Sequence, residues 1–211
     1  MQRRQPAPEQ ELNAGPEVTI PRAAATVILL RGGAHDLEVL LVRRNPESRF
    51  MGGAWVFPGG AVNRGEGDGQ DALRAAALRE LEEEAGIRIE RPDLLTPFSR
   101  WITPAQAKIR FDTWFYLAPA PDGVVPRIDG GEIVDVRWYR PVAALEDYDG
   151  GALTLVFPTI KHLEQLSAFQ SADALIEYAG GLEVRPVQPR VVQHGETARI
   201  LLPGEEGYSA P

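Results

Sequence analysis

The sequence contains no cysteine, and this absence excludes several kinds of chemistry. Disulfide bonds, thiol nucleophiles and cysteine-ligated zinc sites all require that residue. Long apolar runs are also missing, because the longest one, residues 23–30, is too short to cross a bilayer. The basic residues after Met1 lack the apolar segment of a signal peptide, and the last residues are not a Ser-Lys-Leu type of peroxisomal address. We therefore expect no membrane partner and a cytoplasmic location.

Positive charge is scarce relative to negative charge, which gives a net charge of −8 and a pI near 5.0. This balance disfavours nucleic acids and acidic membranes as partners, because both carry dense negative charge. An anionic small molecule remains compatible with it if arginines gather locally and a metal ion adds positive charge. With 211 residues and 44% apolar content, the chain is long enough to bury one sizeable core.

The composition divides the chain into three segments. Residues 1–20 are rich in proline, glutamine and glutamate, which is typical of a flexible arm. Residues 21–180 carry the apolar patterns of a single domain. Residues 181–211 hold short β-like runs broken by prolines, which predicts a C-terminal extension that packs on the domain or on a partner subunit.

Residues 21–180 mix strand and helix patterns. Alternating or β-branched runs predict strands at 22–31, 37–44, 55–57, 97–102, 110–117 and 133–139. Helical patterns lie at 71–85, 141–145, 159–169 and 173–178. This order favours an α/β protein, an α/β/α sandwich around a mixed β-sheet, with extra C-terminal helices and an extended tail.

The predicted helix 71–85 carries an unusual group of carboxylates. Glu80, Glu83 and Glu84 lie at i, i+3 and i+4, so they project from one face. Such like charges repel one another in an isolated helix, whereas Mg²⁺ or Mn²⁺ would turn the repulsion into attraction because both ions prefer carboxylate oxygen. The alternative is a solvated acidic face. Gly86 follows the helix where a C-terminal glycine cap belongs.

The segment from Gly60 to Ile87 resembles the Nudix box, and Glu66 fits the acidic position in its first half. The second half of the box is matched by Arg79, Glu80, Leu81, Glu83, Glu84, Gly86 and Ile87. Twelve residues separate Glu66 from Arg79, five more than the box has. The added residues are loop formers, which predicts a longer turn before an unchanged helix. Counted back from Arg79, Asp71 is the alternative to Glu66 as the outer supporting acid.

The resemblance implies a Nudix fold and metal-assisted hydrolysis of a diphosphate linkage. It assigns Mg²⁺ or Mn²⁺ to Glu80, Glu83 and Glu84, with the Gly59 carbonyl as a further ligand. It gives Arg79 the task of holding the helix carboxylates in place through an ion pair. Glu80 and Glu132 are both candidates for the general base, and Glu132 has the alternative of being an exposed loop acid. Because dimerisation is common in that family, a homodimer is also compatible with the resemblance.

The residues before the box resemble the motif of the peroxisomal-type coenzyme A diphosphatases and their bacterial relatives. The matching residues are Leu40, Leu41, Arg44, Arg49, Gly53 and 57–60, while Val42 and Asn45 depart from the motif. Arginines suit bidentate phosphate contacts, so we predict substrate binding by Arg43, Arg44, Arg49 and Arg64. For each of them the alternative is a pair with a helix glutamate or a place in solvent. Trp55, Trp101 and Trp114 are either core residues or stacking surfaces for adenine.

These observations lead to one principal function and three alternatives. The principal one is hydrolysis of coenzyme A or acyl-coenzyme A to phosphopantetheine and adenosine 3′,5′-bisphosphate. The first alternative is the same chemistry on ADP-ribose, NADH or another nucleoside diphosphate derivative. The second is a non-catalytic Nudix sensor, for which an eroded box or an attached DNA-binding domain would be typical. The third is a structural protein with an acidic helix. It leaves unexplained both Arg79 and the tight turn that Phe57, Pro58, Gly59 and Gly60 predict before the helix.

Overall fold

The computed structural model describes residues 18–128, 130–194 and 197–208. Its strands are β1 (Arg22–Arg31), β2 (Glu38–Arg44), β3 (Trp55–Val56), β4 (Gly59–Ala61), β5 (Thr96–Ile102), β6 (Phe111–Pro119), β7 (Ile133–Tyr139), β8 (Pro186–Val187), β9 (Arg190–His194) and β10 (Thr197–Leu201). Its helices are α1 (Gly69–Ala85), α2 (Pro141–Asp149), α3 (Phe157–Leu166) and α4 (Ala172–Gly180), with a short 3₁₀ turn, Pro92–Leu94.

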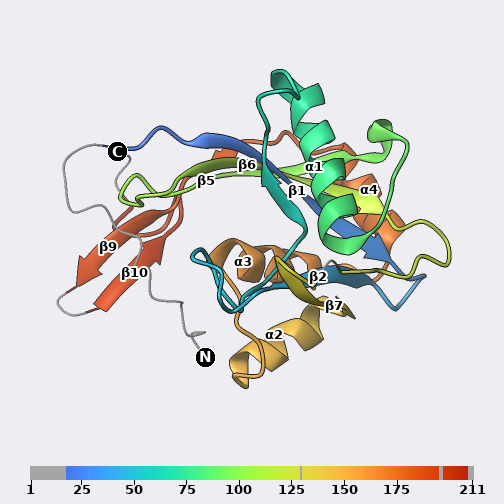
Figure 1. Ribbon diagram of the computed structural model, residues 1–211. Coiled ribbons are helices and arrows are strands. Elements are labelled where there is room, and N and C mark those ends of the chain that lie inside the picture. Colours follow the sequence, from blue (N-terminus) through green and yellow to red (C-terminus); the bar gives the residue numbers. More distant parts are fainter. Residues whose placement is uncertain (1–17, 129, 195–196, 209–211) are drawn as a thin grey trace.

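A mixed sheet forms the centre of the molecule, with the strand order β3–β2–β1–β6–β5–β8. In addition, β4 pairs with β1 and β7 pairs with β2. The β1–β6 and β5–β8 pairs are parallel, whereas β1–β2, β2–β7 and β5–β6 are antiparallel. Strands β9 and β10 form a separate antiparallel hairpin that extends to the left in Figure 1.

Helices cover both faces of this sheet (Figure 1). Helix α1 buries Ala76, Ala77 and Leu81 against one face. Helices α2, α3 and α4 pack on the other face, where Leu163 and Leu175 are fully buried. The predicted α/β/α sandwich around a mixed sheet is therefore confirmed, including the extra C-terminal helices. None of the helices in the described residues has the length and apolar character needed to span a bilayer.

Most predicted elements appear within a few residues of their expected bounds, but β4 was not predicted. Its Gly59 and Gly60 were interpreted as a turn, because glycines carry no side-chain pattern. In the fold this segment pairs through its backbone with Ala24–Thr26 of β1. The predicted arm, residues 1–20, falls almost entirely outside the described residues. The predicted extension, 181–211, contributes β8 to the edge of the main sheet.

Strands β1 and β2 diverge, and this divergence opens the centre of the sheet. They pair only at Leu30↔Val39 and Arg31↔Glu38. Farther along, β1 turns to β4, while β2 pairs with β3 and β7. Side chains from the α1 face and from the α3 face can therefore meet in the gap between the two strands.

A neutral histidine lies in the core on the α3 side of the sheet. His162 is only 1% exposed, and its Nε2 atom lies 2.6 Å from Ser99 Oγ. Aromatic rings surround it, and the nearest, Phe115, has its centroid 4.2 Å away. Burial lowers the pKa of His162 to about 4, because the charged imidazolium would lose its hydration there.

We predict that His162 makes the protein sensitive to mild acid. Its pKa is lower in the folded state than in the unfolded state, so folding stability is complete above the ordinary histidine pKa and falls as the pH drops toward 4. Linkage gives a loss of about 2 kcal/mol between pH 7.5 and 5. Urea denaturation at both pH values should show this extra loss in the wild type and not in His162→Gln. Equal losses in the two proteins would contradict the prediction.

Candidate active site

Arg79 connects the acidic face of α1 to the loop and strand in front of it. Its Nη1 atom lies 2.8 Å from Glu80 Oε1 and 2.9 Å from Glu83 Oε2. On its other side, Nε donates to Glu66 Oε1 at 2.7 Å and Nη2 donates to the carbonyl oxygen of Ala61 at 3.1 Å. One guanidinium therefore has four acceptors, two on its own helix and two outside it.

Glu66 rather than Asp71 reaches this network, so the structure answers the question that the long box loop raised. Besides accepting from Arg79, Glu66 accepts the backbone N–H of Asn63 at 2.6 Å, which closes the loop on itself. Burial is the largest single influence and would raise the pKa of Glu66, but the hydrogen bonds from Arg79 and from the Asn63 N–H and the charge of Arg79 together lower that pKa. Asp71 is exposed in the first turn of α1.

Glu84 is the most deeply buried of the helix carboxylates, with 5% of its surface exposed. Its Oε2 atom accepts the backbone N–H of Gly59 at 2.9 Å, and its Oε1 atom lies 3.8 Å from Arg44 Nη1. Burial raises the pKa of Glu84 to about 8, which these two contacts only partly offset. Burial also raises the pKa of Glu80. A cation placed against these oxygens would favour the charged form of both groups.

The two glycines of β4 permit the close approach of helix and strand. A Cβ atom on Gly60 would lie 2.3 Å from Glu80 Oε1. One on Gly59 would lie 2.4 Å from Thr26 Oγ1 and 2.6 Å from the carbonyl oxygen of Ala25. Any side chain here would separate β4 from β1 or from the acidic helix.

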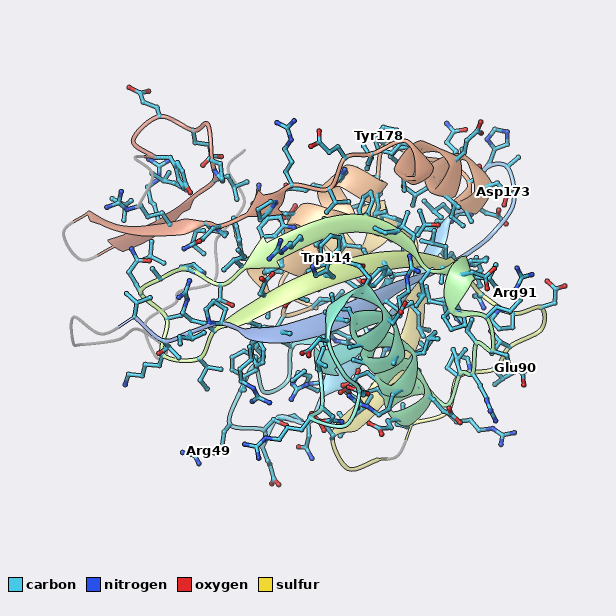
Figure 2. All side chains as sticks on the ribbon, turned by 90° about the horizontal axis from the view of Figure 1, so that it is seen from above. Arg49, Glu90, Arg91, Trp114, Asp173 and Tyr178 are labelled. Atoms are coloured by element: carbon cyan, nitrogen blue, oxygen red, sulfur yellow. The ribbon has the colours of Figure 1, made fainter. Side chains whose placement is uncertain are left out.

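A large cavity of about 1030 Å³ opens beside the acidic helix. Glu80 and Glu83 line one part of it, and Arg44, Arg49 and Glu132 also line it. Arg44 connects two carboxylates of the site, because its Nη1 atom lies 3.8 Å from Glu84 Oε1 and its Nη2 atom lies 2.9 Å from Glu132 Oε1. Figure 2 shows Arg49 at the outer edge of the molecule.

Two of the four predicted substrate-binding arginines lie away from this cavity. Successive residues of a strand point to opposite faces, so Arg43 projects to the α2–α4 side while Arg44 projects toward Glu84. Arg43 lines a smaller, separate cavity instead. Arg64 is exposed in the loop before α1 and lines neither cavity.

The sequence singled out Trp101 but not Arg22 or Phe157, and all three line the cavity. Arg22, at the start of β1, lines it with its guanidinium 5.9 Å from the Phe111 ring centre. Trp101 and Phe157 form an aromatic pair on the same wall, with centroids 6.2 Å apart. Phe111, Thr113 and Phe115 alternate along β6 and also line the cavity, but period-two spacing alone does not distinguish a cavity wall from a core.

The carboxylates of Glu80, Glu83 and Glu84 are suitable ligands for a hard divalent ion, although Arg79 pairs with two of them. Among the described residues, no three acidic or histidine side chains already stand close enough together to hold a metal. In this structure the Nη1 atom of Arg79 pairs with both Glu80 and Glu83. Arg79 would keep its contacts with Glu66 and Ala61 if Nη1 released the two helix carboxylates. Glu80, Glu83 and Glu84 could then offer oxygen ligands of the kind that Mg²⁺ and Mn²⁺ prefer.

Comparison with known proteins agrees with this geometry. The chain is 26% identical over 206 residues to a Caenorhabditis elegans protein provisionally named nudix hydrolase 7, a match that covers 82% of this chain and 68% of that protein. It is 22% identical over 272 residues to the acyl-coenzyme A diphosphatase NUDT19 of Xenopus laevis, covering 82% and 72% respectively. A crystal structure of a NUDIX hydrolase from Alicyclobacillus acidocaldarius has a TM-score of 0.69 and 28% identity, and covers 80% of this chain and 99% of its own.

The model of the NUDIX domain family matches residues 20–156, which is well over half of the chain. That range includes β1, β4, the Arg79 network and the whole acidic helix. Nudix hydrolases generally use divalent metal ions, and the donor set of α1 fits one. The chain belongs to the Nudix family and is a hydrolase that acts on pyrophosphate bonds.

Proposed function

We propose that this protein hydrolyses the diphosphate linkage of coenzyme A or its thioesters. The observation that carries the proposal is the lining of the cavity, which joins residues of an acidic helix, an arginine pair and several aromatic and apolar side chains. The similarity to an acyl-coenzyme A diphosphatase across 82% of the chain supports the same substrate class. The products would be phosphopantetheine and adenosine 3′,5′-bisphosphate.

The acidic helix would hold the metal through Glu80, Glu83 and Glu84, with the Gly59 carbonyl as a further ligand. Mg²⁺ or Mn²⁺ bound there would neutralise phosphate charge and lower the pKa of a bound water molecule. Glu84 is fixed from two sides, by the Gly59 N–H and by Arg44, so its carboxylate is oriented before any ligand arrives. Arg79 acts as a positioning residue, because Glu66 and Ala61 fix its guanidinium beside the helix carboxylates.

Glu80 is the better candidate for the general base. It lines the cavity, and its side chain is only 17% exposed. Glu132 also lines the cavity, but its carboxylate is 2.9 Å from Arg44 Nη2 and 60% exposed. Its role in the proposal is to orient Arg44 for a phosphate oxygen.

The substrate would lie along the cavity from the arginines to the aromatic wall. Arg44 and Arg49 suit the phosphate groups, since guanidinium binds phosphate oxygens in pairs. The wall formed by Trp101, Phe157 and Ile109 suits the long pantetheine arm and an attached acyl chain. ADP-ribose has no such arm, so it would leave this part of the cavity empty.

We predict that Glu83→Gln and Glu84→Gln each lower kcat by about 100-fold or more, because each removes a negative charge from the proposed metal site. Steady-state assays with Mg²⁺ or Mn²⁺ would measure the effect, and EDTA should abolish the wild-type activity. Glu82→Gln is the matched control, since Glu82 lies exposed on the same helix. Near-normal turnover in both site variants would refute the metal assignment.

We also predict that the wild type prefers coenzyme A to dephospho-coenzyme A, and that Arg49→Met reduces this preference about tenfold. One charge-assisted hydrogen bond to the 3′-phosphate is worth that much. The measurement is the ratio of kcat/KM for the two compounds, with ADP-ribose and NADH assayed in parallel. Arg88→Gln, which changes an exposed arginine remote in sequence from the motif, should leave the ratio unchanged. A higher kcat/KM for ADP-ribose or NADH than for coenzyme A would show that coenzyme A is not the preferred substrate. Binding of these compounds without turnover would indicate a sensor.

A further inference from the structure

A second, smaller cavity of about 120 Å³ lies on the α2–α4 side of the sheet. Its wall comes from three neighbouring strands and from the turn that follows α2. Residues of this wall are Arg43, Gly53, Trp55, Arg137, Ala152, Leu153 and Thr154. Two guanidiniums thus face one small space, in a chain whose net charge is −8.

Strand pairing places the two arginines on the same face. In the sheet register Arg43 is opposite Trp55 of β3 and Asp135 of β7, and Arg137 is two residues farther along β7. Arg137 stacks on the indole of Trp55, with its guanidinium 5.1 Å from the ring centre. Arg137 thus lines the cavity beside this ring.

Arg43 has a buried donor without an acceptor. Its Nε atom is shielded from solvent and has no hydrogen-bond partner among the described residues. The carboxylate of Asp135, the residue opposite Arg43, is 2.7 Å from Arg137 Nη2 instead. A guanidinium always carries its proton, so Arg43 keeps its positive charge on the wall of the cavity.

We propose that this cavity binds a small tetrahedral oxyanion, of the phosphate or sulfate kind, between Arg43 and Arg137. The space corresponds to roughly four water molecules, which is enough for such an ion. The two guanidiniums carry two positive charges and the carboxylate of Asp135 carries one negative charge, so one positive charge remains to attract the oxyanion. Thr154 lines both cavities, but Arg43 and Arg44 point to opposite faces of β2, so the two sites use different arginines. The proposal does not rest on the proposed function.

Phosphate binding to the whole protein tests the proposal, with EDTA present so that no metal-dependent binding at the acidic helix contributes. Thermal unfolding and isothermal titration calorimetry are measured with sodium phosphate and sodium sulfate, against sodium chloride at equal ionic strength. The wild type should show a saturable rise in Tm and a measurable Kd. Arg43→Met and Arg137→Met should each weaken binding at least about tenfold, the value of one charge-assisted hydrogen bond.

Two further measurements distinguish phosphate binding by Arg43 and Arg137 from a purely structural role of these arginines. Arg43→Met should have a Tm equal to or above that of the wild type without phosphate, because it removes the unpaired donor and keeps an apolar stem. Arg49→Met, which changes only the catalytic cavity, should retain the phosphate-dependent rise. The proposal is overturned if the wild type shows no saturable effect, if Arg43→Met retains it, or if Arg49→Met abolishes it.

Discussion

The guanidinium of Arg79 is the contact on which the geometry of the catalytic site depends. Two of its acceptors, Glu66 and Ala61, belong to the loop and to β4, and the other two, Glu80 and Glu83, belong to α1. It is 25% exposed, so its ion pairs are screened less than those on the open surface. By holding strand, loop and helix together, Arg79 keeps several carboxylates close to one another that would otherwise separate.

The second requirement is the gap between β1 and β2. Were the two strands paired along their whole length, the α1 carboxylates and the aromatic wall would lie on opposite faces of a closed sheet. Because β1 turns to β4 instead, Gly59 and Gly60 bring the backbone against Glu84 and Glu80. The cavity therefore borders the acidic helix and the apolar wall at the same time, which is what the proposed reaction needs.

Much of the fold followed from the sequence, because the apolar patterns were strong. Segment 22–31 is a continuous apolar and β-branched run, 133–139 alternates with period two, and the acidic helix has apolar residues at helical spacing. All three form the predicted elements, and their buried side chains contribute to the cores on the two sides of the sheet. Strand β4 could not be found in this way, since its glycines have no side chain to show a period. Its pairing with β1 depends on tertiary contacts.

The candidate site was predictable where it depends on one element and unpredictable where elements meet. The helical spacing of Glu80, Glu83 and Glu84 placed them on one face, and the contacts of Arg79 with two of them are those expected of a positioning ion pair. The choice between Glu66 and Asp71 depended on how a long loop folds back, which spacing does not determine. Arg43 shows the opposite case, because strand alternation separates it from Arg44 although the two are neighbours in sequence.

The central claim is that the acidic stripe of α1 faces a divalent ion in the working enzyme. A crystal structure of the protein with Mn²⁺ and a non-hydrolysable coenzyme A analogue tests it most directly, because the anomalous signal of manganese locates the ion. The account predicts manganese bound by the carboxylates of Glu80, Glu83 and Glu84, with Arg79 still held by Glu66 and the diphosphate beside the ion. Manganese bound elsewhere, or none bound while Nη1 of Arg79 still holds Glu80 and Glu83, would contradict it.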